Sequence, residues 1–130
     1  MARKMMLGEL AFREGDHELA FASLREAVRL EDELLYDEPP GWLQPVRHAL
    51  GALLMAAGRY AEAEEVYSAD LERNPNNGWS LLGLEKARRM QGETDGLDDL
   101  VRRRSKAWAR ADVAPTSSCY CEPGAVQFQQ

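Results

Sequence analysis

The chain has 130 residues, of which 45% are hydrophobic and 29% are charged, with a net charge of -6 and only two cysteines. A single domain of this length buries roughly two thirds of its unfolded surface, so we expect it to fold without a cofactor. The acidic balance argues against nucleic-acid binding, and the lack of an apolar run of about 20 residues or of a secretory leader predicts a soluble, cytoplasmic protein with no membrane association.

Helices are predicted through most of the first 110 residues. Apolar residues recur there at spacings of three and four, and Gly or Pro falls only where helices should end. The predicted helices span residues 2–14, 17–35, 43–57, 60–73, 78–91 and 94–110. Most of the turns between them are short, so neighbouring helices should be antiparallel and the fold class all-α.

The helix pairs repeat along the sequence. Positions of the first pair recur 43 residues later, and positions of the second pair recur 34 residues later. The first series pairs Leu7, Gly8, Gly15, Ala20 and Leu24 with Leu50, Gly51, Gly58, Ala63 and Tyr67; the second pairs Leu50, Leu53 and Gly58 with Leu84, Ala87 and Gly92. A constant period of 34 residues with nine inserted residues, 35–43, explains both offsets.

The second unit, residues 44–77, has the clearest pattern. It carries Leu50-Gly51, Gly58-Arg59-Tyr60, Ala63-Glu64, Tyr67 and Asn74-Pro75. This pattern resembles the tetratricopeptide repeat, a helix-turn-helix unit of about 34 residues. The resemblance covers about residues 1–111 and implies a right-handed α-solenoid of three units, 1–34, 44–77 and 78–111, followed by an irregular tail, 112–130.

The third unit departs from this pattern. Glu85, Arg88 and Arg104 stand where the family has small or apolar residues, which leaves the packing of this unit open. A polar end unit is expected, because the last repeat of an array faces water. We expect Trp108 to cover apolar surface that a further repeat would otherwise cover.

The insertion is predicted to be an ordered elbow, because Pro39-Pro40 stiffens it and forbids helix. Its sequence from Tyr36 to Trp42, followed by Pro45 to His48, is similar to the C-terminal repeats of bacterial tetratricopeptide repeat proteins of unknown function. That similarity suggests that the chain is the end of a longer protein. We expect Trp42 to fill the junction between units one and two; an elbow leaning over the groove would instead place Tyr36, Asp37, Glu38 and Trp42 on its rim.

The resemblance also implies a binding surface, because the first helix of each pair lines the concave side of such arrays. The implied inward-facing residues are Met5, Glu9, Phe12, Arg13, His48, Ala52, Met55, Trp79, Leu82, Lys86 and Arg89. Glu9 would repel the terminal carboxylate that some family members bind. The apolar residues, with Lys86 and Arg89 at one end, favour a peptide or partner protein that has apolar anchors and an acidic flank.

Catalytic motifs are not recognisable. The sequence has no phosphate-binding glycine loop, no nucleophile elbow and no His-Glu-x-x-His helix. His17 is interpreted as a surface residue and His48 as a hydrogen-bonding residue of the groove lining. The leading hypothesis is therefore a non-enzymatic interaction module.

The tail offers an alternative chemistry. Cys119 and Cys121 are interpreted as free thiols, as two ligands for copper(I) or zinc, or as a redox pair, while a disulfide between them would close a strained small ring. Two ligands do not complete a zinc site, and no further donors are placed near them. The other hypotheses are thus soft-metal binding by the tail and self-association by end-to-end stacking of the terminal units.

Overall fold

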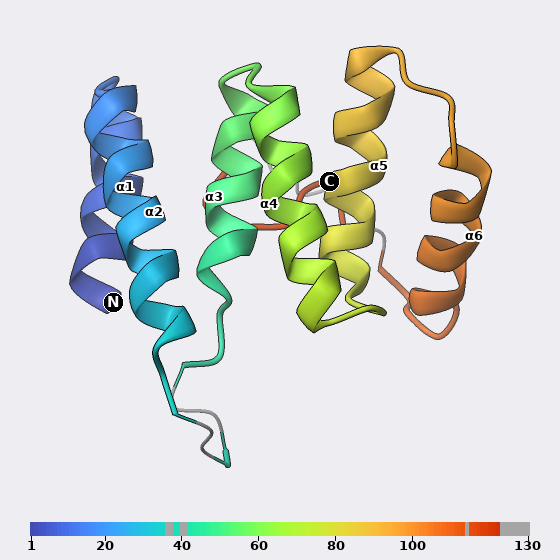
Figure 1. Ribbon diagram of the computed structural model, residues 1–130, viewed down its shortest axis with the longest axis horizontal. Coiled ribbons are helices and arrows are strands. Elements are labelled where there is room, and N and C mark those ends of the chain that lie inside the picture. Colours follow the sequence, from blue (N-terminus) through green and yellow to red (C-terminus); the bar gives the residue numbers. More distant parts are fainter. Residues whose placement is uncertain (36–37, 40–41, 114, 123–130) are drawn as a thin grey trace.

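The computed structural model describes residues 1–35, 38–39, 42–113 and 115–122, and within these ranges it contains six helices and no strands. The helices are α1 (Ala2–Glu14), α2 (His17–Asp32), α3 (Val46–Ala56), α4 (Tyr60–Arg73), α5 (Gly78–Gln91) and α6 (Leu97–Ala107). They stack side by side as successive antiparallel pairs (Figure 1). The prediction of an all-α helical repeat array is confirmed. Within the described ranges, no helix combines the length and the apolar character that crossing a bilayer requires.

Left-handed glycines end the first helix of each pair or form the turn that follows it. Gly15, Gly58 and Gly92 have φ of 87°, 74° and 75°. The backbone N–H of Gly15 bonds back to Ala11 and Phe12, and that of Gly92 bonds back to Arg88 and Arg89. Because only glycine adopts this conformation at little cost, these positions keep the turns tight and the paired helices antiparallel.

Three helices are shorter than predicted. α2 ends at Asp32 and not at residue 35, α3 begins at Val46 and not at residue 43, and α6 runs from Leu97 to Ala107 and not over 94–110. Pro45 precedes α3, and Gly96, with φ of 68°, precedes α6. These two residues set the later starts, because neither adopts ordinary helical geometry there.

The insertion is bridged by side chains of the helices that flank it. Both carboxylate oxygens of Glu31, on α2, accept from the Val46 N–H at 3.1 Å, while Arg47 donates to both oxygens of Asp32 at 2.7 Å. Arg73 adds a second bond to Asp32 at 2.6 Å. The first two units are therefore joined by direct contacts between α2, α3 and α4.

The unusual polar residues of the third unit all form ion pairs. Glu85 is only 6% exposed and lies 3.0 Å from Arg89 and 2.7 Å from Arg104, although the second approach lacks hydrogen-bond geometry. Arg88 donates to Glu64 of α4 at 2.8 Å. Ion pairs therefore take the place of the apolar contacts that the repeat pattern would supply.

Candidate functional site

The chain's own tail covers the face formed by the first helix of each pair. We call the face lined by α1, α3 and α5 the inner face, and residues 115–122 the tail segment. Lys86 of α5 donates to the Thr116 carbonyl, Ser118 donates to the His48 carbonyl of α3 at 2.9 Å, and Arg13 of α1 donates to the Cys121 carbonyl at 3.2 Å. In Figure 1 the red end of the chain passes behind α4 toward α3. The tail segment is irregular, as expected, and it contacts all three helix pairs.

Ser118 lies in a small polar site on this face, formed by the Tyr67 hydroxyl and the His48 carbonyl, which we call the seat. Its side chain is buried, and its Oγ lies 2.7 Å from the Tyr67 Oη. Because the single Ser118 hydroxyl proton goes to the His48 carbonyl, Tyr67 must donate to Ser118. Burial raises the pKa of Tyr67 far above its usual value, against a smaller opposite effect of the Ser118 hydrogen bond, so the phenol keeps the proton that it donates.

Two glycines hold Tyr67 in place. A Cβ on Gly51 of α3 or on Gly83 of α5 would come closer than 3.0 Å to its ring. The ring of this α4 residue therefore passes between the two neighbouring helices, and its hydroxyl emerges at the inner face. The sequence pattern predicts the close approach at Gly51; Gly83 lies outside the repeat position and was missed.

A cavity of about 330 Å³ lies beside the tail segment. Its lining includes Ala52, Met55, Tyr60, Leu82, Lys86, Arg89, Met90 and, from the tail segment, Thr116, Ser117, Ser118 and Glu122. Five of the residues predicted from the groove pattern thus come together here, with two cations at one cavity. Tyr60, at the start of α4, and Met90, near the end of α5, also line this cavity and were not predicted.

A second cavity, of about 560 Å³, lies between the start of α3 and the tail segment. Its lining is Leu43, Gln44, Pro45, His48, Asn77, Trp79, Ser118, Cys119 and Tyr120. The Trp79 ring meets Tyr120 edge-on at 6.2 Å and Trp108 at 4.9 Å. Trp108 also donates to the Gly78 carbonyl at 3.0 Å, so it closes the end of the third pair against α5.

Comparison with known families agrees with this architecture. A family profile described as Tetratricopeptide repeat matches residues 45–77, and a second profile with the same description matches residues 4–33. The chain contains tetratricopeptide repeats at these two stretches. The matches coincide with the pairs α3–α4 and α1–α2, so the period in the sequence corresponds to the structural repeat. None of the curated proteins matches the chain.

The first repeat contributes less to the inner face than its pattern implies. Met5 and Phe12 are buried in the core, and the Phe12 ring stacks on His17 with centroids 4.7 Å apart. Glu9 is partly buried, and desolvation raises its pKa against the opposing charge of Arg13. Among the four residues of the first repeat that were predicted to face inward, Arg13 is the one with a hydrogen bond to the tail segment.

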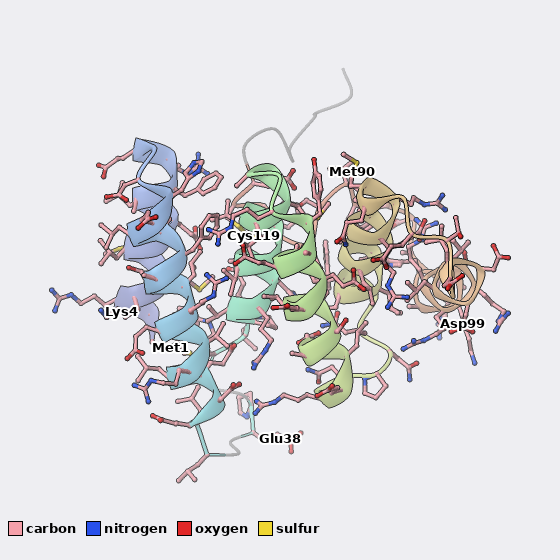
Figure 2. The ribbon with its side chains drawn as sticks, turned by 45° about the horizontal axis from the view of Figure 1, so that its top comes forward. Met1, Lys4, Glu38, Met90, Asp99 and Cys119 are labelled. Carbon is pink, nitrogen blue, oxygen red and sulfur yellow. A yellow bond between two sulfur atoms is a disulfide. The ribbon has the colours of Figure 1, made fainter. Side chains whose placement is uncertain are left out.

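The two described residues of the predicted rim, Glu38 and Trp42, line neither of these two cavities. Tyr36 and Asp37 lie outside the described residues. Figure 2 shows Glu38 at the lower edge of the molecule, well away from Cys119, and Trp42 is partly buried and packs against the core. The unpredicted Gln44 does reach the tail segment, where its Nε2 lies 3.6 Å from the Cys119 Sγ.

Cys119 and Cys121 form a disulfide with each other, so the interpretation of two free thiols is wrong. In this state neither sulfur is a thiolate that could bind copper or zinc. Elsewhere in the described part of the chain, no group of three or more His, Cys, Asp and Glu residues could hold a metal ion. Self-association by stacking stays a prediction, and Met6 and Leu10, both exposed on α1, lie where it would occur.

Buried polar side chains join three helices behind the inner face. Asp70 of α4 accepts from Ser80 at 2.6 Å and from Asn77 at 2.7 Å, and Asn77 also lies 2.7 Å from the His48 Nε2. Burial raises the pKa of Asp70, but its interactions with His48, Ser80 and Asn77 outweigh that effect and hold the pKa below its usual value. Ser80 is fully buried and donates to the carboxylate, so this cluster supports His48 and offers no accessible nucleophile.

Proposed function

We propose that the inner face binds a short segment of a partner protein and that the protein acts by this binding, without catalysis. Tetratricopeptide repeats are in general protein–protein interaction modules and are typically non-catalytic. The observation that carries the proposal is the tail segment, because a non-helical stretch of chain already lies on this face and is held by side chains of all three repeats, namely those of Arg13, Tyr67 and Lys86.

The chemistry of the face indicates which segments it favours. Met55, Leu82 and Met90 supply a soft apolar wall in the cavity of about 330 Å³, and Lys86 and Arg89 supply positive charge. Glu122 of the tail segment lines the same cavity. An apolar anchor followed by an acidic residue therefore suits the cavity, because methionines adapt to the anchor and the cations orient the acid.

A matched pair of methionine variants tests this proposal. Peptides selected from a random library on the full chain should lose at least tenfold in affinity for Met90→Asp, since the carboxylate replaces an apolar contact and repels the acidic residue of the peptide. Met6→Asp is the control, because Met6 is similarly exposed (67% against 58%) but lies on α1. Calorimetric titration of both variants gives the two affinities, and equal binding by both would contradict docking at this cavity.

A further inference from the structure

The tail segment is held by four buried side chains, those of Ser117, Ser118, Cys119 and Cys121, and by contacts to its backbone. The Ser118 hydroxyl bonds to Tyr67 and to the His48 carbonyl, whereas Lys86 and Arg13 donate to the backbone carbonyls of Thr116 and Cys121. Backbone carbonyls are the same in every sequence, so the two cations contribute affinity without selectivity. Ser118, in contrast, bonds to α3 and α4 through its side chain, so the seat around it can distinguish one sequence from another.

The seat suits a serine because of its size and its donors. Ser118 is only 5% exposed, and the Tyr67 ring that forms one wall is fixed between Gly51 and Gly83. A larger side chain would meet this ring or turn into one of the two cavities that Ser118 also lines, and in neither position would it make both hydrogen bonds. An alanine would fit but would leave both the Tyr67 hydroxyl and the His48 carbonyl without their partner, which is the costly case for buried polar groups.

The tail segment can leave its place without unfolding the array. It follows α6 through residues 109–113, all of which are exposed and therefore bring little packing. The contacts with Lys86 and Arg13 lie at the surface, and the helices contact one another without the tail. Local release therefore costs the contacts of the tail segment itself, including the burial of Cys119 and Cys121, and leaves the contacts between the helices intact.

We propose that the inner face is a serine-selective peptide site, that the chain's own tail segment fills it, and that a partner binds by supplying a segment with a serine at the Ser118 position. This inference rests on the proposed function and adds the class of ligand and the competitor. The tail is tethered at an effective concentration in the millimolar range, so a free peptide competes poorly until the tail is removed.

The test uses the full chain and one defined probe, a labelled peptide of residues 115–122 prepared with its disulfide closed. In the variant Ser118→Arg the tail cannot make both hydrogen bonds of the seat, and the helical circular dichroism should remain that of the wild type. By fluorescence anisotropy this variant should bind the peptide at least tenfold more tightly than the wild type does. A peptide carrying alanine in place of the serine should lose about tenfold or more, as expected for two lost hydrogen bonds. Ser105→Arg, on the exposed side of α6, is the matched control and should behave as the wild type.

Each outcome decides a different point. Equal binding of the peptide to wild type and Ser118→Arg, or no binding to either, would show that the tail does not occupy a peptide site. Equal binding of the serine and alanine peptides would overturn the selectivity. A concentration-dependent wild-type dimer in sedimentation would show that the seat is filled by the tail of a second copy. None of these results depends on Met90, so the proposed function can survive or fail independently.

Discussion

At the scale of single residues, Tyr67 connects the core with the inner face. Its ring lies between Gly51 and Gly83 while its hydroxyl bonds to Ser118. The sequence predicts an aromatic residue and a close helix approach in the second repeat, because both belong to the repeat pattern. It does not predict the hydroxyl's partner, since Ser118 lies 51 residues away in a segment without a period.

Replacing Gly83 by Ala should therefore destabilise the fold by about 1–3 kcal/mol, because the new methyl group would overlap the Tyr67 ring. Urea denaturation measures the loss. In a Tyr67→Leu background, where the ring is absent, the same substitution should cost clearly less, which makes the pair strongly non-additive. An equal cost in both backgrounds would contradict the placement of the Tyr67 ring against Gly83.

At the scale of elements, α3 depends on α2 for its first turn. Pro45 precedes α3 and provides no side-chain cap, and Glu31 supplies the missing acceptor across the insertion. The bidentate pair of Asp32 and Arg47 lies one residue further along each helix. The geometry of the first two repeats is thus set by helix-to-helix contacts, whatever the course of the inserted residues.

Glu31→Ala should lower the free energy of unfolding by about 1 kcal/mol, the usual cost of losing an N-terminal cap. Hydrogen exchange should accelerate at the amides of the first turn of α3, starting with Val46. Glu33→Ala is the control, because Glu33 pairs with Arg29 at the exposed surface, where such pairs contribute at most about 1 kcal/mol and often nothing. Unchanged exchange at Val46 would show that the cap is dispensable.

The sequence predicts the helices correctly where apolar residues recur at helical spacing, but it misplaces several helix ends. Apolar spacing identifies all six helices, but it cannot place the ends set by single residues such as Pro45 and Gly96. The same period brings Ala52, Met55, Leu82, Lys86 and Arg89 to one cavity, because equivalent positions of successive repeats share a face. Their role in binding stays a prediction. Phe12 shows the limit of the approach, since the pattern cannot distinguish a residue between helices from one on their surface.

At the scale of the whole molecule, the cluster around Asp70 couples the second and third repeats. It joins His48 of α3, Asp70 of α4, and Ser80 of α5 with its cap Asn77. Because the pKa of Asp70 is lower in the folded chain than its unfolded value of about 3.9, the ionised group stabilises the fold. That stabilisation is present above about pH 4 and is lost as the pH falls through the folded pKa.

We therefore expect the wild type to lose stability as the pH falls below about 4, and Asp70→Asn to show a shallower loss from a lower starting point. Urea midpoints measured from pH 7 downward provide the comparison. Asp98→Asn, an exposed substitution on α6, should follow the wild-type curve. An Asp70→Asn curve parallel to that of the wild type would exclude Asp70 as a source of the acid sensitivity.

The tail segment has a mechanical consequence for the array. Stacked helical repeats contact mainly their neighbours, so the curvature and the length of such arrays can vary elastically. Here the tail segment connects Lys86 of the third repeat with Arg13 of the first across the inner face, without passing through the helices between them. It therefore limits how far the outer repeats can move apart, and its departure would leave an array that is longer on average and more variable in its curvature.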